Sequence, residues 1–505
     1  LRFVNIRGLH GSNTPRVGPG FVPVIPAKAL ICIQNFRSGH NTGMAESDEG
    51  WAQEQWGDAD LGDKRRQLRA VQIGAKLMAL PGAPLSQQVG SQSELIGAYR
   101  FLSNKEVNGQ ALTEAHRKAT LAAAGVSKEV ILMIQDRTTL DYSSHRRRTA
   151  GLGEISTVRE RRGALLQAAL GVEAESGRIL GLAHSELIVR DPERKQKEGR
   201  RRSKSAEALA WERTVEAIGP VPEGATWVYV SDRESDIFEY MEACLKQGAG
   251  FILRVFHERS LHSRTADVGE EVVMSLLTTA RALPPSTDPA ARYTVKVPST
   301  TKAPARDAEV VLGWCSVELR PPWYARERAP LRAQVVRVWE PSPTEGAPGI
   351  EWILLTSLTI HNAADARQIV KWYERRWLIE DFNMCLKTGC EIERSQLDHV
   401  NDLDRLLGFK LPIAARLLQL RQDVRLAPDV PAEQIVDSIY VRLLRAKLKL
   451  KILTMSLRDF WMRVAQLGGH RGRKSDGPPG WRTLWRGWLQ LQTLVEGALL
   501  LQSST

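Results

Sequence analysis

Residues 373–387 hold an acid, several cations and a phenol at spacings that suit phosphoryl-transfer chemistry. On one helix at about 100° per residue, four of these side chains would share an arc of about 60°: Tyr373, Arg376, Glu380 and Lys387. Ile379, Phe382 and Leu386 would form a separate apolar face that packs on a core. A carboxylate in a row of cations predicts a metal ligand whose neighbours bind a phosphate backbone.

Two further acids follow apolar strands. Residues 129–135 contain a continuous apolar run, typical of a strand buried on both faces, and Asp136 comes directly after it. Asp232 closes the next candidate strand, 226–231. A strand-end Asp in a turn and an N-cap are the plain alternatives, but an unpaired acid beside so apolar a strand is costly unless it binds metal or water. With Glu380, these acids are candidate catalytic ligands for Mg²⁺ or Mn²⁺, and two ions about 3.5–4 Å apart assist phosphodiester cleavage.

The spacing Tyr-x2-Arg-x3-Glu-x6-Lys at 373–387 resembles the Y-R-E-K signature of bacterial DDE transposases of the insertion-sequence-four family, which includes transposon-five-like members. Asp-Arg-Glu-Ser-Asp at 232–236 resembles a second family signature, whose first Asp is a metal ligand. The resemblance favours Asp232 and leaves Asp236 as its close competitor. The resemblance to the family covers about residues 48–500. It implies that the phosphates beside the cut are held by Tyr373, Arg376 and Lys387.

Two single residues resemble family residues near the cut site. Trp352 resembles a tryptophan that stacks on an extruded base, a contact worth about 1–3 kcal/mol. An ordinary tryptophan in a strand core is the alternative. Arg254 resembles an arginine beside the site, with a plain surface arginine as its equal rival. The resemblance therefore predicts that both residues contact DNA.

Residues 46–120 have a helical pattern and contain a basic cluster within two turns: Lys64, Arg65, Arg66 and Arg69. A solvated charged surface is the plain alternative for such a cluster. Segments 61–66 and 97–104 resemble the N-terminal DNA-end-recognition domain of the same family. That resemblance favours DNA binding by this region.

The middle of the chain alternates predicted strands and helices, which indicates an α/β fold. Strands are expected at 129–135, 163–172, 178–184 and 226–231. A helix is expected at 206–218. Periodicity supports only this general class. The resemblance implies a ribonuclease-H-like catalytic domain over 121–425, a β-rich insertion at about 258–350 and a helical C-terminal dimerisation domain over 426–505.

Composition favours a nucleic-acid partner. The net charge of +12 and the pI near 9.5 suit a polyanion, although a generally basic proteome is the alternative. The five cysteines are odd in number and show no CxxC pair, which predicts a reducing cytoplasm. No apolar run reaches the ~18 residues of a membrane span, so a soluble, nucleoid-associated protein without a membrane partner is expected. Residues 1–45 are predicted to be a disordered or non-native extension, with Met44 as the natural start.

These features together predict a transposase that acts as a homodimer on double-stranded DNA, at transposon terminal repeats and target DNA. The resemblance implies cut-and-paste chemistry, in which a freed 3′ hydroxyl attacks the opposite strand to form a hairpin and later attacks the target. Two alternatives remain. A ribonuclease-H-like metal nuclease without strand transfer needs the same acids but neither end-recognition nor dimer-pairing regions. An inactive DNA-binding relic would keep the basic helices and lose an acid.

Overall fold

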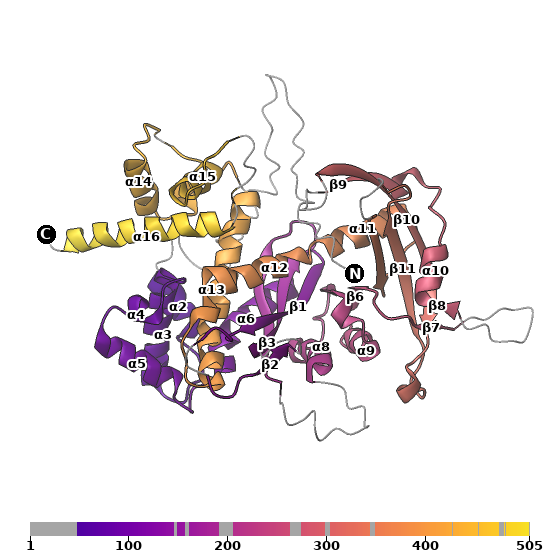
Figure 1. Ribbon diagram of the computed structural model, residues 1–505, viewed down its shortest axis with the longest axis horizontal. Coiled ribbons are helices and arrows are strands. Elements are labelled where there is room, and N and C mark those ends of the chain that lie inside the picture. Colours follow the sequence, from indigo (N-terminus) through magenta and orange to yellow (C-terminus); the bar gives the residue numbers. More distant parts are fainter. Residues whose placement is uncertain are drawn as a thin grey trace, which may run out of the picture.

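The computed structural model of the protein describes residues 48–145, 149–156, 161–190, 206–262, 274–297, 304–343, 349–426, 428–452, 454–473, 479 and 481–503. The predicted extension 1–45 lies outside the described residues. Figure 1 shows an N-terminal group of helices, a large sheet with helices against it, and a C-terminal group of helices. The mixture of helices and strands confirms the general α/β class.

Helices make up the described N-terminal region: α2 (Asp48–Trp56), α3 (Lys64–Ala79), α4 (Leu85–Gln88), α5 (Gln92–Leu102) and α6 (Gly109–Val126). Polar caps begin three of them, because Asp63, Ser91 and Asn108 each accept a hydrogen bond from a backbone amide of the first turn. Trp56 is fully buried, and a Cβ at Gly74 would come within 2.1 Å of its ring. The expected helical character of this region is confirmed.

Within the described residues, strands of one sheet are β1 (Ile131–Asp141), β2 (Gly153–Ser156), β3 (Arg161–Glu173), β4 (Ile179–Ile188), β5 (Trp227–Ser231), β6 (Gly250–Arg254), β7 (Ser260–Leu261), β8 (Met274–Ser275), β9 (Arg292–Val297), β10 (Arg306–Leu319), β11 (Leu331–Trp339) and β12 (Glu351–Thr356). Their order is β2-β3-β1-β5-β6-β12-β11-β10-β7-β8, with β4 beside β3 and β9 beside β10. The four strands expected from the sequence are β1, β3, β4 and β5.

The strands of the expected β-rich insertion extend the central sheet. β12 pairs antiparallel with β6 on one side and with β11 on the other. β10 then pairs with β11, β9 and β7. The residues that the sequence assigned to an insertion therefore continue the same hydrogen-bonded ladder as the central strands.

Helices pack on both faces of the sheet. One group comprises α8 (Ala206–Ile218), α9 (Phe238–Lys246) and α10 (Leu276–Ala282), and the other comprises α11 (Ala363–Glu374), α12 (Trp377–Met384) and α13 (Val400–Leu426). Alternate residues of β1 belong to two different cores, because successive side chains of a strand point to opposite faces. Ile131 and Met133 share a core with α8 and α9. Leu132 and Ile134 share a core with α11, α12 and α13.

Residues 373–387 do not form the single straight helix that their spacing predicted. A turn at Arg375 and Arg376 separates α11 from α12, and a π-helical turn, Cys385–Gly389, ends α12. Because a π turn closes i→i+5 hydrogen bonds, an extrapolation at 100° per residue does not hold as far as Lys387. The predicted apolar face is confirmed by three fully buried residues: Ile379, Phe382 and Leu386.

The described C-terminal helices are α14 (Ser438–Lys447), α15 (Leu457–Leu467) and α16 (Trp481–Ser503). They share a small core of their own that includes Phe460 and Leu491. Trp488 stacks with Tyr440 and Trp461 at ring-centroid distances of 5.0 and 5.2 Å. None of the helices that the structure describes is long and apolar enough to cross a lipid bilayer.

Candidate active site

Two adjacent parallel strands bring Asp136 and Asp232 together. The last parallel pair of β1 and β5 is Ile134 opposite Val230. Asp136 lies two residues further along β1, and Asp232 lies two residues after Val230, directly after the end of β5. Both side chains therefore point to the face of Ile134 and Val230, against which α12 packs. The sequence placed Asp136 after the end of a strand, but β1 continues to Asp141 because it stays paired with β3. Asp136 lies where the neighbouring β5 stops.

Glu380 approaches the same face from α12. Ile379 and Phe382 anchor this helix in the core, and both are fully buried. Asn383 lies nearly one turn after Glu380, and its Nδ2 donates a hydrogen bond to Asp136 Oδ2 at 3.4 Å. The contact joins α12 to β1 beside the candidate site. The site predicted from the sequence did not include Asn383, although an amide side chain within the apolar face of a helix indicates a buried hydrogen-bond partner.

The three acids are close enough to influence one another. Burial is the largest cause that raises the pKa of Asp136 to about 7; the charge of Arg376 opposes the rise, and the charges of Asp232 and Glu380 add to it. Carboxylates gathered in this way disfavour one another's ionised form unless a proton or a cation compensates the charge. The cluster is therefore electrostatically suited to a cation.

The chemistry of the donors fits Mg²⁺ or Mn²⁺, because both ions favour carboxylate oxygens. In the part of the chain that the structure describes, however, no three side chains of His, Cys, Asp or Glu converge closely enough to hold an ion. Glu380 Oε1 instead accepts a hydrogen bond from Arg376 Nη2 at 2.7 Å. As a metal ligand, Glu380 would have to exchange this arginine for the ion.

Guanidinium groups gather beside Asp232. Arg254 ends β6 and its Nη2 donates to the Glu351 carbonyl at 3.1 Å. Burial lowers the pKa of Arg254; Tyr373 raises it, and the positive charges of Arg233 and Arg376 lower it further. A buried guanidinium with two further arginines near it is typical of a site that binds an anion such as a phosphate. The structure thus places Arg254 at the predicted site and adds Arg233, which the sequence reading did not assign although it follows Asp232 directly.

A second ion pair joins the strand ends. Arg137, which follows Asp136, pairs with Glu234, which belongs to the same signature as Asp232. Arg137 Nη1 also donates to the Glu207 carbonyl of α8 at 2.9 Å. The residues that follow the two candidate ligands therefore connect β1, β5 and α8 on the opposite side of the sheet.

Asp236, the competitor of Asp232, lies in a different environment. It is fully buried, and Oδ2 accepts hydrogen bonds from the backbone amides of Phe256 and His257 at 2.8 and 2.7 Å. Its Oδ1 accepts from Arg259 Nη2 at 2.7 Å. These contacts hold the chain that leaves β6. The geometry favours Asp232 as the residue that faces Asp136, and its role as a ligand stays a prediction.

Trp352 and Tyr373 lie in the core beside the site. Their exposed fractions are 8% and 5%, and their rings meet edge to face at a centroid distance of 5.3 Å. A base could stack on Trp352 only after this ring is uncovered. The position agrees with the alternative of a strand-core tryptophan, and contact with DNA stays a prediction for both residues.

Lys387 lies beyond the predicted face of Glu380. Its Nζ donates to the Thr139 carbonyl of β1 and pairs with Glu393 at 3.5 Å. Lys387 lies within the π-helical turn, so the regular helical spacing on which the predicted single row depended is interrupted before this residue. A role for Lys387 on a DNA phosphate stays a prediction.

The predicted basic cluster lies at the start of α3. Lys64 and Arg65 are exposed. Arg69 is partly covered, because its Nη2 reaches the Glu94 carbonyl of α5 at 3.4 Å. A Cβ at Gly97 would come within 2.2 Å of the same nitrogen, so glycine leaves room for the arginine. Arg69 thus joins α3 to α5 behind the exposed pair.

Residues 48–107 match the family model described as transposase DNA-binding. This match supports a transposase. It spans α2 to α5 and includes the basic cluster of α3, so it also supports DNA as the partner of the chain.

Proposed function

We propose that the protein is a DNA transposase of the insertion-sequence-four family, which catalyses cut-and-paste excision and strand transfer through a ribonuclease-H-like core. One observation carries this proposal. Asp136 and Asp232 each lie two residues beyond the last parallel pair of β1 and β5, on the face against which α12 packs, and Glu380 of α12 is close enough for its charge to act on Asp136. The match of residues 48–107 to transposase DNA-binding supports the same function independently of the site.

The proposed ligands of one or two Mg²⁺ or Mn²⁺ ions are Asp136, Asp232 and Glu380. Such ions supply Lewis-acid stabilisation of the attacking and leaving oxygens. Asn383 would keep the Asp136 carboxylate oriented through its hydrogen bond. Arg376 would be free to bind phosphate once Glu380 turns to the ion, since Glu380 is its hydrogen-bonding partner here. Each of these roles belongs to a residue on the same face of the sheet.

Phosphates of the DNA end would meet the arginine cluster. The positive charges of Arg233 and Arg376 act unfavourably on Arg254, so bound phosphate would stabilise its charged form. Arginine binds two phosphate oxygens at once, which orients the backbone as well as attracting it. In the proposed reaction, hydrolysis frees a 3′ hydroxyl, which attacks a phosphodiester of the opposite strand. The hairpin bond forms, and the bond to the flanking DNA breaks and leaves a 3′ hydroxyl on the flank. Hydrolysis opens the hairpin, and the regenerated 3′ hydroxyl then attacks a phosphodiester of the target DNA. A homodimer would hold two ends together.

The test uses the purified full-length protein and a plasmid that carries the inverted repeats flanking its own gene. We expect double-strand excision with a hairpin intermediate in Mg²⁺ or Mn²⁺, and no cleavage in EDTA. Nicking that never produces hairpins or joined products would favour the metal nuclease. Specific binding without any cleavage in either metal would favour the DNA-binding relic. Cleavage that is undiminished in EDTA would overturn the metal-dependent mechanism.

A further inference from the structure

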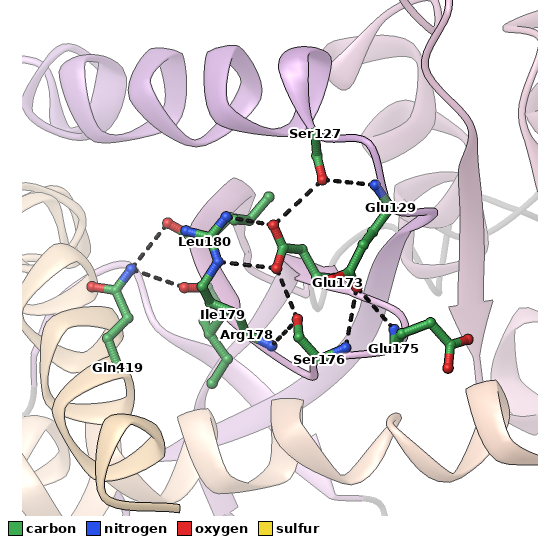
Figure 2. A network of polar contacts seen from close by, with 9 residues as sticks. All are labelled: Ser127, Glu129, Glu173, Glu175, Ser176, Arg178, Ile179, Leu180 and Gln419. Carbon is green, nitrogen blue, oxygen red and sulfur yellow. Dashed lines mark hydrogen bonds and ion pairs between the residues drawn. The ribbon is translucent and has the colours of Figure 1, made fainter. Parts of the chain in front are cut away.

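Hydrogen bonds from neighbouring side chains hold the turn between β3 and β4. Figure 2 shows the polar contacts that brace it. Glu129 Oε2 accepts hydrogen bonds from the backbone amides of Glu175 and Ser176, both at 3.1 Å. Glu173 Oε2 accepts from Ser176 Oγ at 2.8 Å and from Arg178 Nε at 3.0 Å. The turn is therefore a fixed support rather than a loose loop.

The turn and the start of β4 are tied to α13. Gln419 Nε2 donates to the carbonyls of Ile179 and Leu180 at 3.2 and 3.0 Å (Figure 2). Gln422 Nε2 donates to the Gly177 carbonyl at 3.2 Å. Both glutamines donate to backbone carbonyls next to the turn. The hairpin consequently has a defined position relative to the helices on this face of the sheet.

The Glu175 carboxylate does not take part in this bracing. In Figure 2 it is turned away from the other contacts. It accepts three hydrogen bonds from α11, with donors at 2.6, 2.6 and 3.1 Å: Gln368 Nε2, Lys371 Nζ and Trp372 Nε1. A single side chain thus holds two successive turns of α11.

The backbone of the turn holds the residue that follows α11. The carbonyl of Glu175 accepts a hydrogen bond from Arg375 Nη2 at 2.9 Å. Gly177 has a φ of +72°, and a Cβ there would come within 2.6 Å of Arg375 Nη1. The glycine leaves space for the guanidinium to lie across the turn. Arg375 is the first residue of the break between α11 and α12.

We propose that Glu175 is a positioning residue, which holds α11 and its junction with α12 so that Arg376 and Glu380 face Asp136. The inference rests on the proposed function and adds a residue far from the signature motifs. Arg376 directly follows the held junction, and Glu380 lies four residues further. Any rotation at the junction would move both side chains relative to the sheet.

The energetics separate positioning from general stability. Glu175 and Lys371 have side-chain exposed fractions of 51% and 47%, and an exposed ion pair contributes only about 0–1 kcal/mol to folding. A displacement of about 1 Å in a catalytic group can nevertheless slow a reaction by about a hundredfold. Loss of Glu175 should therefore slow cleavage much more than it lowers stability.

The test compares Glu175→Ala, Glu175→Gln and the matched control Glu309→Ala. Glu309 also pairs with an exposed arginine, Arg292, at 2.5 Å, but this ion pair joins β10 to β9 and includes no residue of α11. We expect Glu175→Ala to slow single-turnover cleavage by about 10- to 100-fold. Binding of the DNA end and the melting temperature should stay near wild-type values. Glu175→Gln keeps an acceptor oxygen and should recover most of the rate, and Glu309→Ala should match the wild type.

A second measurement does not depend on catalysis. Trypsin cuts after arginine, so release of the junction should speed cleavage after Arg375 and Arg376 in Glu175→Ala without DNA or metal. Mass spectrometry would identify the sites, with Glu309→Ala as the reference. Unchanged proteolysis and an unchanged cleavage rate would overturn the positioning role. If trypsin cuts Glu175→Ala faster but the wild type never cleaves DNA, Glu175 holds the junction as proposed and the proposed function is wrong.

Discussion

Asp232 and Asp236 lie four residues apart and have different partners. Asp232 directly follows β5 beside Asp136, and its side chain caps the short helix that follows by accepting a hydrogen bond from the Glu234 amide at 2.9 Å. Asp236 is buried beneath Arg259 and two backbone amides. Their different partners thus separate a residue suited to bind a ligand from one suited to hold a loop.

Removal of any proposed ligand should abolish cleavage and leave the DNA-end affinity intact. Asp136→Asn, Asp232→Asn and Glu380→Gln are each expected to lower the single-turnover rate by about a thousandfold or more, since residues that act as a unit fail together. Cleavage assays and electrophoretic shifts on the same DNA would check this. A variant that still cuts at the wild-type rate would remove its residue from the site.

Asp236→Asn should damage folding instead. Removing one partner of a buried ion pair leaves the charge of the other partner uncompensated, which costs about 3–5 kcal/mol of folding free energy. Arg259 has a side-chain exposed fraction of 14%, so little water would compensate. Thermal melts should show a large decrease for Asp236→Asn and almost none for Asp232→Asn. The opposite pattern of melts would exchange the roles given to the two acids.

Arg376 should contribute more to DNA than Lys387. Arg376 lies among the acids and the arginine cluster, whereas Lys387 is paired with Glu393. Each lost phosphate contact lowers the salt-dependence slope of binding by about one unit. We expect that change for Arg376→Ala and a smaller one for Lys387→Ala, measured over a salt series. A decreased melting temperature with an unchanged slope would identify Arg376 as a structural ion pair only.

Trp352→Ala tests whether the tryptophan belongs to the core. Its ring is nearly covered and packs on Tyr373, so truncation should cost about 3–5 kcal/mol of folding free energy. Chemical denaturation would measure this loss. Stability close to that of the wild type, with weaker binding to a DNA end, would instead support stacking on an extruded base.

Glu374 should make stability depend on pH. Burial raises its pKa from the ordinary 4.5 to about 7, while Arg375, Arg367 and Lys371 oppose the rise. The folded state then holds a proton that the unfolded state releases, so folding stability decreases as pH rises from about 4.5 to about 7. Glu374→Gln should be more stable than the wild type at pH 8, by up to about 3 kcal/mol. Melts of both proteins should converge near pH 4, and an equal difference at both values would indicate a packing effect.

Local patterns in the sequence determined much of what was found. The apolar run before Asp136 predicted a buried strand, because side chains that alternate between two cores must be apolar at every position. The motif-bearing residues of the N-terminal region predicted a DNA-binding segment, which the match at 48–107 supports. The apolar face of α12 also followed from spacing alone, since a helix repeats over short distances.

Only the tertiary structure decided which candidates meet. The separation of Asp232 from Asp236 depends on Arg259, and the partners of Lys387 come from β1 and from Glu393. The positioning role proposed for Glu175 depends on hydrogen-bond donors in α11, which lies nearly 200 residues further along the chain. A pattern within one segment carries no information on partners that arrive from distant segments. Packing of the sheet and helices supplies those partners, and with them the geometry of the site.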